Sequence, residues 1–79
     1  MIPSDGQIRW RCRRGMLEID VSLTRFCDEQ LSNLSDDDRV VFFAMLAEHD
    51  PVWWDWLLGD SLPDDPAQKA MLLRIKGGS

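Results

Sequence analysis

Cys12-Arg13-Arg14-Gly15-Met16-Leu17-Glu18-Ile19-Asp20 is the stretch that decides the fold, because it fits one continuous helix and a corner between two helices about equally well. If it is helical, charged groups flank a glycine on one side, since spacings of i, i+3 or i+4, and i+7 align them. These residues are Arg11, Arg14 or Gly15, Glu18 and Ser22. A glycine inside a helix costs roughly 0.5–1 kcal/mol relative to alanine, and close approach of another surface is one reason to keep it. Alternatively a helix ends at Gly15 and the chain turns there, and such a corner can also be a docking point.

Length and composition predict one small domain over residues 1–79, ordered from about 7 to 76 with short flexible ends. A chain of 79 residues buries only about 60% of the surface that its unfolded form exposes, so we expect no deep substrate cavity. The content of 44% apolar and 29% charged residues is typical of a globular protein and not of a disordered one.

The net charge of −5 is unevenly distributed along the chain. Residues 1–18 hold four arginines and two carboxylates, whereas residues 19–79 hold five basic and twelve acidic residues. Nonspecific nucleic-acid binding needs several cations that face phosphates. Because the greater part of the chain is acidic, we expect no nucleic-acid partner.

The cysteines and the single histidine form no pattern of disulfides, metal ligands or catalytic groups. Cys12 and Cys27 are too few for a disulfide framework or a zinc site, and His49 fits a helix end better than a general base. Residues 1–6 lack the features of a signal peptide, and no apolar run reaches the roughly 18–20 residues of a membrane span. We expect a cytoplasmic chain with reduced thiols, no metal site and no membrane insertion.

Residues 7–14 and 19–24 leave helix and strand both open. Apolar and polar residues alternate in each segment, which predicts two strands, and residues 13–16 between them could form a hairpin turn. An apolar stripe with a spacing near 3.5 residues predicts a helix over the same region instead. The stripe consists of Met16, Ile19, Leu23, Phe26 and Leu31. The pattern favours a helix over residues 16–31 by a small margin.

Ser35-Asp36-Asp37-Asp38 predicts the start of another helix, with Ser35 as the N-cap and carboxylates beside the positive end of the helix dipole. The eight residues from Val40 to Ala47 are all apolar. Such a run leaves little room for a solvent-exposed face, so it predicts a helix buried on most sides, with Phe43 and Leu46 in the core.

Asp50-Pro51 and Asp64-Asp65-Pro66 predict two further helix starts, each with an aspartate as the cap and a proline at the first helical position. The first of these helices ends at Gly59, and the second ends before a frayed tail at residues 77–79. The inner face of the second helix is formed by Met71, Leu72 and Ile75.

Trp53, Trp54 and Trp56 cannot all face inward on one short helix, so we expect at least one of them on the surface. Partly exposed aromatic residues together with arginines are typical of protein interfaces. The competing interpretation is that these tryptophans cover a small core.

The run Arg13-Arg14-Gly15-Met16-Leu17-Glu18 resembles the Arg-Gly-x-x-Glu signature of the succinate dehydrogenase assembly factor family, whose bacterial members are called SdhE and whose mitochondrial members include assembly factor 2. The resemblance covers roughly residues 7–76 and includes matching positions outside the signature. These are Trp10, Cys12, Asp20, Leu34-Ser35-Asp36-Asp37, Asp50-Pro51 and Trp56. The signature alone is short, but the length of the chain and the other matching positions in the same order make the resemblance specific. It implies an all-α fold, a small single-domain five-helix bundle, and so favours the helix over the hairpin.

The same resemblance implies a function. Family members bind the flavoprotein subunit of succinate dehydrogenase, and sometimes that of fumarate reductase, and promote covalent attachment of FAD to a histidine of that subunit. The resemblance therefore implies an FAD assembly factor that binds no cofactor stably, because FAD is delivered to or attached on the partner. We expect a monomer that is not an enzyme, since the residues offer no nucleophile or metal site. The expected partner-binding residues are Trp10, Arg13, Arg14, Gly15, Glu18 and Asp20. No cofactor-binding residue is assigned.

Two departures and two alternatives accompany this interpretation. Gln7 stands where many relatives carry a basic residue, which would weaken one edge of the contact, and any role of a longer C-terminal tail does not carry over. The first alternative is a small helical adaptor for other partners, including the antitoxin-type role given to some relatives, which would not enrich a flavoprotein in a pull-down. The second is a nucleic-acid-binding hairpin, with steeply salt-dependent binding. Its cations would be Arg9, Arg11, Arg13 and Arg14.

Overall fold

The computed structural model describes residues 1–77 and consists of helices connected by short loops. They are α1 (Asp5–Arg11), α2 (Leu17–Gln30), the 3₁₀ turn η1 (Leu31–Asn33), α3 (Asp36–Met45), α4 (Asp50–Leu58) and α5 (Pro66–Gly77). Within this part of the chain there are five α-helices and no strand, so the predicted all-α five-helix fold is confirmed and the hairpin alternative is wrong. The tail predicted at residues 77–79 lies largely outside the described residues.

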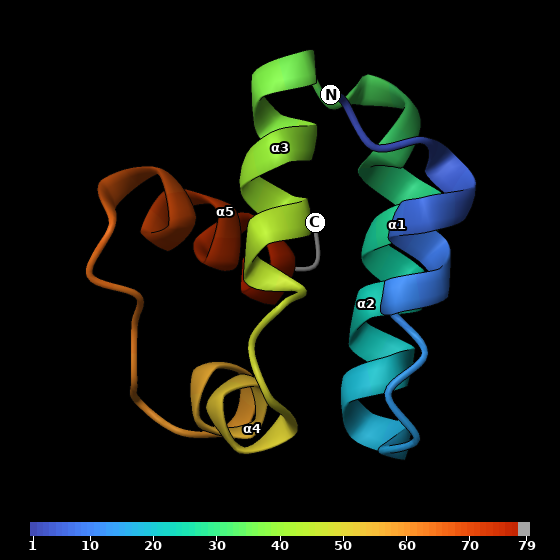
Figure 1. Cartoon of the computed structure of the whole chain (residues 1–79). Helices are drawn as coiled ribbons and strands as arrows, with labels where there is room; N and C mark the ends of the chain where they lie inside the picture. The colour runs from blue at the N-terminus through green and yellow to red at the C-terminus, as the bar shows by residue number, and fades with distance from the viewer. Residues whose placement is uncertain (78–79) are drawn as a thin grey trace.

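The helices pack as two groups that share one core. In Figure 1, α1 lies along α2 on one side of the molecule, while α3 runs through the middle with α5 behind it and α4 across one end. Direct contacts join α5 to both α3 and α2, and α4 to α2. The predicted helix over residues 16–31 is confirmed as α2 and η1, and its apolar stripe faces this core, since Ile19, Leu23, Phe26 and Leu31 are buried. Met16, the first residue of the predicted stripe, is instead the N-cap of α2 and is partly buried against the core.

Side-chain caps fix the starts of three helices. The Ser35 hydroxyl accepts from the backbone N–H of Asp38 at 3.1 Å, and the Asp65 carboxylate accepts from the N–H of Gln68 at 3.0 Å, so both predicted caps are confirmed. Ser4 and Gln7 form a reciprocal capping box at the start of α1. The Gln7 side chain thus has a role within α1, since its amide oxygen accepts from the Ser4 N–H at 2.8 Å.

The predicted cap of α4 is wrong by one residue. His49 occupies the N-cap position, and Asp50 and Pro51 lie in the first turn of the helix. Proline is still tolerated there, because backbone N–H groups of the first turn have no partner within the helix. The Asp50 carboxylate does not cap the helix but accepts a hydrogen bond from the Arg14 side chain. The helix ends at Gly59 as predicted.

The core is apolar and includes residues from every helix. Its largest fully buried side chains are Trp53, Phe42, Ile8, Ile19, Leu23, Met45, Leu72 and Ile75. Aromatic pairs lie edge to face within it: the Phe26 and Phe42 ring centroids are 5.2 Å apart and those of Trp53 and Trp56 are 5.0 Å apart. The predicted inner face of α5 is confirmed, since Met71, Leu72 and Ile75 are all buried.

The prediction that residues 40–47 are buried on most sides is wrong. Val40 is 47% exposed, and Ala44 and Ala47 are also exposed, because α3 packs along one side only, on α5 and through Phe42 on Phe26 of α2, and faces solvent along the other. Leu46 is buried, as predicted. Phe43 lies at the edge of the core and is half-buried, with the Arg11 guanidinium 5.3 Å from its ring centroid.

The tryptophans of α4 divide between the core and the surface. Trp53 and Trp56 are buried, and the Trp53 indole N–H donates to the Met45 carbonyl at 3.0 Å. Trp54 is 39% exposed, which confirms that at least one of the three reaches the surface. Among the described residues, no helix has the length and apolar character needed to cross a membrane.

Candidate functional site

The stretch from Cys12 to Met16 forms a corner between α1 and α2. Helix α1 ends at Arg11, and α2 begins at Leu17, so the arrangement of Arg11, Gly15 and Glu18 along a single helix is wrong and a corner between two helices is confirmed. The predicted helix end at Gly15 is wrong, because the helix stops at Arg11 with Cys12 as its C-cap and Gly15 lies within the connecting loop. Gly15 has a φ of +85° and is exposed. This left-handed conformation explains the glycine, since residues with a Cβ rarely adopt it. A Cβ added at this position would meet no atom of the chain within 4 Å.

Asp20 holds the corner in shape from the first turns of α2. Its Oδ1 accepts from the backbone N–H of Arg14 at 2.8 Å, and its Oδ2 accepts from the N–H of Gly15 at 3.1 Å. Two successive loop amides are therefore satisfied by one carboxylate. Charge-assisted hydrogen bonds of this kind are stronger than neutral ones, so the loop conformation is well determined.

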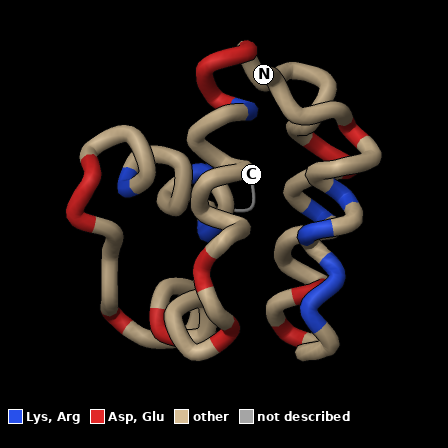
Figure 2. The backbone as a smooth tube through the Cα atoms, viewed as in Figure 1, with Lys and Arg blue, Asp and Glu red and all other residues tan. Residues whose placement is uncertain are grey.

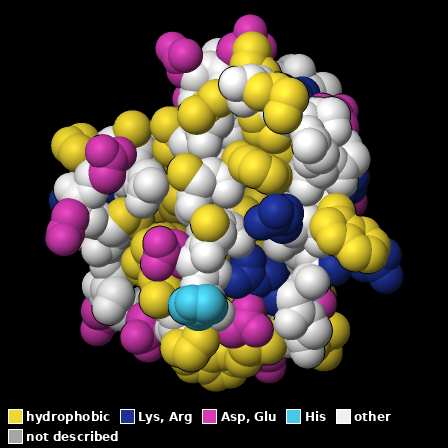
Figure 3. All heavy atoms as spheres, in the orientation of Figure 1, with side chains coloured by type: hydrophobic (Ala, Val, Ile, Leu, Met, Phe, Trp, Pro, Cys, Tyr) yellow, Lys and Arg dark blue, Asp and Glu magenta, His cyan; other side chains and the backbone are white. Residues whose placement is uncertain are grey.

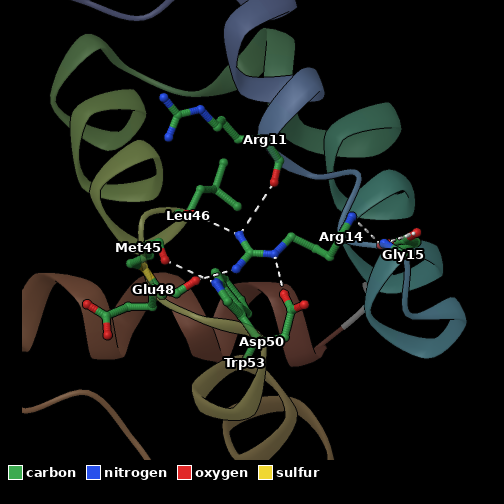
Figure 4. Close-up of polar contacts among 9 residues, drawn as sticks. Arg11, Arg14, Gly15, Met45, Leu46, Glu48, Asp50 and Trp53 are labelled. Atoms are coloured by element: carbon green, nitrogen blue, oxygen red, sulfur yellow. Dashed lines mark hydrogen bonds and ion pairs between the residues drawn. The ribbon is translucent and has the colours of Figure 1, made fainter.

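The Arg14 side chain fastens this corner to the loop between α3 and α4. Its Nε donates to Asp50 Oδ1 at 2.8 Å, its Nη1 donates to the Leu46 carbonyl at 2.7 Å, and its Nη2 donates to the Glu48 carbonyl. Figure 4 shows the guanidinium at the centre of these acceptors. Only 11% of the side chain is exposed. We call these contacts the Arg14 clasp. Because its donors are used within the chain, Arg14 positions the corner and presents little charge outside it.

The corner also carries an open hollow of about 470 Å³. The hollow is lined by Trp10, Arg13, Gly15 and Asp20. Trp10 is 69% exposed, and the Arg13 guanidinium lies 5.8 Å from its ring centroid, within cation–π range. A largely exposed tryptophan beside an arginine is unusual for a surface without a binding role, because both residue types are enriched at binding hot spots.

The structure therefore brings four of the six predicted site residues into one hollow. Glu18 is exposed in the first turn of α2, directly after the corner, and Arg14 does not line the hollow but forms the clasp. Local sequence patterns missed Asp50 as the partner of Arg14, because 36 residues separate the two and each has an ordinary local explanation. Also unpredicted is a second hollow of about 480 Å³, which continues along α2 from Asp20. It is lined by Asp20, Val21, Thr24, Arg25, Asp28 and Glu29.

The charge around the corner differs from that of the rest of the molecule. Figure 2 marks a run of basic positions along α1 and the corner, while acidic positions lie on α2, on α3, on α4 and in the loop before α5. In Figure 3 basic side chains gather beside a projecting apolar group on the same face. No group of three or more His, Cys, Asp or Glu side chains among residues 1–77 could hold a metal ion. The corner is therefore suited to contact another surface.

Comparison with known proteins gives a match over nearly the whole chain. The family model described as flavinator of succinate dehydrogenase matches residues 6–78. The chain belongs to this family. The resemblance drawn from the signature at Arg14, Gly15 and Glu18 is thereby confirmed. The match begins in α1 and extends beyond the end of α5, so it covers the sequence of all five helices and not only the corner.

Individual relatives of the flavinator family agree with this assignment. The FAD assembly factor SdhE of Coxiella burnetii is 40% identical over 70 residues, which are 89% of this chain and 85% of that protein. The FAD assembly factor SdhE of Shewanella oneidensis is 39% identical over 72 residues, 91% of this chain and 88% of its own. The FAD assembly factor SdhE of Photorhabdus laumondii is 41% identical over 75 residues, which are 95% of this chain and 85% of that protein. No solved structure matches the chain.

Proposed function

We propose that the chain binds the flavoprotein subunit of succinate dehydrogenase through the α1–α2 corner and promotes covalent attachment of FAD to that subunit. Membership of the flavinator family supports the process, and the names of the relatives support the role of an FAD assembly factor. The observation that carries the choice of surface is the hollow lined by Trp10, Arg13, Gly15 and Asp20, which lies at the family signature.

Each residue of the corner has a distinct part in the proposed contact. Trp10 and Arg13 form an exposed pair that can cover an apolar area on the partner and donate hydrogen bonds at its edge. Gly15 lets the partner's backbone come close, because no side chain stands above it. Glu18 adds a free charge at the start of α2. Arg14 and Asp20 act as positioning residues through the clasp and the loop amides.

The proposed role of the chain is to orient groups and not to supply catalytic ones. Fixing two reacting groups in a near-attack geometry can remove several kcal/mol from a barrier, on the order of 7–11 in the most favourable cases. FAD and its acceptor side chain both belong to the partner in this proposal, and the chain keeps neither. Because an assembly factor must then leave its partner, we propose an interface of moderate size. We also propose that the chain acts as a monomer and in the cytoplasm. The flavoprotein of fumarate reductase is a second partner under the same proposal.

The experiment compares variants of the chain in a strain that lacks its own copy of the gene. Glu18→Ala and Trp10→Ala are expected to reduce in-gel flavin fluorescence of the partner subunit, while their melting transitions stay close to wild type because both side chains are exposed. Asp37→Ala is the matched control: Asp37 is also exposed and is also the second residue of its helix, but it lies on α3. It should leave flavin attachment unchanged.

Two results would contradict the proposal. If Glu18→Ala and Trp10→Ala are stably folded and flavin attachment remains at the wild-type level, the corner is not the docking surface. If Asp37→Ala lowers flavin attachment as much as Glu18→Ala does, the effect follows from charge or helix stability in general. A pull-down of the flavoprotein subunit with each variant then separates loss of binding from loss of attachment in the bound complex.

A further inference from the structure

The two cysteines of the chain meet where α1 packs against α2. Cys12 is the C-cap of α1, Cys27 lies in the last turn of α2, and their Sγ atoms are 3.6 Å apart and share a hydrogen bond. Both thiols are free and almost completely buried. The function proposed above uses neither of them, so the pair needs its own explanation.

A small hollow reaches this pair from the surface. Its volume is about 240 Å³, and it is lined by Arg9, Cys12, Arg13, Thr24 and Cys27. A water molecule occupies about 30 Å³ in the liquid, so a molecule of the size of hydrogen peroxide fits easily. The hollow is separate from the one that contains Trp10, although Arg13 lines both. The sulfur atoms are thus buried in the fold but lie beside a site that a small oxidant can enter.

The surroundings make the two thiols unequal. The hydrogen bond from Cys12 and the nearby Arg9 guanidinium lower the pKa of the Cys27 thiol, against the opposing effect of burial. The hydrogen bond with Cys27 and burial raise the pKa of the Cys12 thiol. Because the thiolate is the reactive form, Cys27 is the thiol that attacks first, and Cys12 is placed to react with it second.

The geometry allows a bond between the two sulfur atoms with a small adjustment. A disulfide needs an S–S distance near 2.05 Å, which is about 1.5 Å less than the observed separation. Cys12 is well placed to move, because it stands where α1 ends, and its N–H is shared between the carbonyls of Ile8 and Arg9 at 3.2 Å each. Cys27 is held inside α2 and can remain in place.

We propose that Cys12 and Cys27 are a modification site that forms a reversible intramolecular disulfide when the chain meets a hydroperoxide. The Cys27 thiolate attacks one peroxide oxygen, the O–O bond breaks, and the leaving oxygen takes a proton to become water, or an alcohol from an alkyl hydroperoxide. The Cys12 sulfur then attacks the sulfenic acid sulfur of Cys27, and the second oxygen leaves as water with the Cys12 proton. Two thiols are oxidised to one disulfide, and the peroxide takes up both electrons.

The bond would close a ring around the corner that carries the candidate site. Residues 12 to 27 include the turn at Gly15 and most of α2, so the disulfide fixes α1 on α2 across this segment. Crosslinking of this kind removes conformational freedom from the unfolded chain, more so than from the folded one. The inference does not depend on the proposed function, since it concerns the chain by itself.

The test uses purified, fully reduced protein and hydrogen peroxide as the probe. After brief exposure under native conditions, free thiols are alkylated and the intact mass is measured. The expected product is a monomer that has lost two hydrogens, takes up no alkylating reagent and returns to the reduced mass with a dithiol reductant. In Cys12→Ser the reaction should stop at a sulfenic acid on Cys27, which a sulfenic-acid-specific reagent traps. Cys27→Ser should react more slowly than Cys12→Ser.

The stability of the oxidised form gives a second readout. Its melting temperature should exceed that of the reduced form by about 4 °C or more, since a loop of this length contributes measurably when its geometry is unstrained. A lower melting temperature would overturn the proposal, because the fold would then not accommodate the bond. Disulfide-linked dimers, sulfinic acids without loss of two hydrogens, or no reaction at all would equally overturn it.

Discussion

Arg13 and Arg14 are neighbours in the chain, yet they contact different parts of the molecule. Arg13 is exposed and its guanidinium lies over the Trp10 ring. Arg14 reaches the loop between α3 and α4 and donates to Asp50 and two carbonyls. The Arg-Gly-x-x-Glu signature therefore combines a residue that shapes the corner, a residue that allows the turn and, in Glu18, a residue that is free to meet a partner.

This difference predicts unequal costs of substitution. Arg14→Ala should lower the free energy of unfolding by about 2–4 kcal/mol, because the acceptors of the clasp lose charged donors in a largely buried position. Arg13→Ala is the matched control and should cost less than about 1 kcal/mol, since it removes only an exposed cation–π contact. Urea titrations measure both values. Similar losses for the two variants would mean that the clasp does not hold the corner.

Gly15 gives a second prediction at the level of the residue. Gly15→Ala should destabilise the fold by about 1–2 kcal/mol, because alanine is strained at a φ of +85° even though the space above the glycine is open. Gly6 lies inside α1, where the atom nearest to an added Cβ is the Ser4 hydroxyl at 3.9 Å. Gly6→Ala should therefore stabilise the fold by about 0.5–1 kcal/mol. Denaturant midpoints compare the two, and the same sign for both would contradict the account of the turn.

Among the elements, α3 shows how a continuous apolar run can still form a two-sided helix. Phe42 and Met45 are fully buried, whereas Val40 is 47% exposed on the opposite side. The run does not reveal this division, because it contains no polar residue to mark the solvent face. Only the positions of α2 and α5 decide which side of α3 is covered.

The division within α3 can be measured with two alanine substitutions. Leu46→Ala, at the end of the helix, should cost about 2–5 kcal/mol because a buried leucine leaves a cavity. Val40→Ala should cost less than about 1 kcal/mol, since its side chain is half in solvent and alanine favours helices. Guanidinium titrations give both numbers. A loss below about 1 kcal/mol for Leu46→Ala would show that the end of α3 is not part of the core.

At the scale of the whole molecule, the structural features that could be predicted from the sequence are those that depend only on residues close together in the chain. Caps such as Ser35 and Asp65 act within one turn, and the inner face of α5 follows from the spacing of its own apolar residues, so both could be predicted. The left-handed turn at Gly15 depends on the Asp20 carboxylate that accepts from two loop amides. The pairing of Arg14 with Asp50 depends on packing between segments 36 residues apart. Neither feature follows from the spacing of residues along the chain, and of the residues involved only Gly15 and Asp20 line the hollow of the candidate site.

The Arg14 clasp has a consequence for the order of events in folding. Its acceptors lie 32 to 36 residues away in the chain, so it can close only after α1 and α2 have met α3 and α4. Contacts that form after the rate-limiting step slow unfolding and leave the folding rate nearly unchanged. Arg14→Ala should thus speed unfolding in stopped-flow denaturant jumps, with little change in the folding limb. If the substitution instead slowed folding by as much as it was expected to speed unfolding, the clasp would be among the first contacts to form. A late clasp means that the corner is the last part of the molecule to become fixed and the first to come loose.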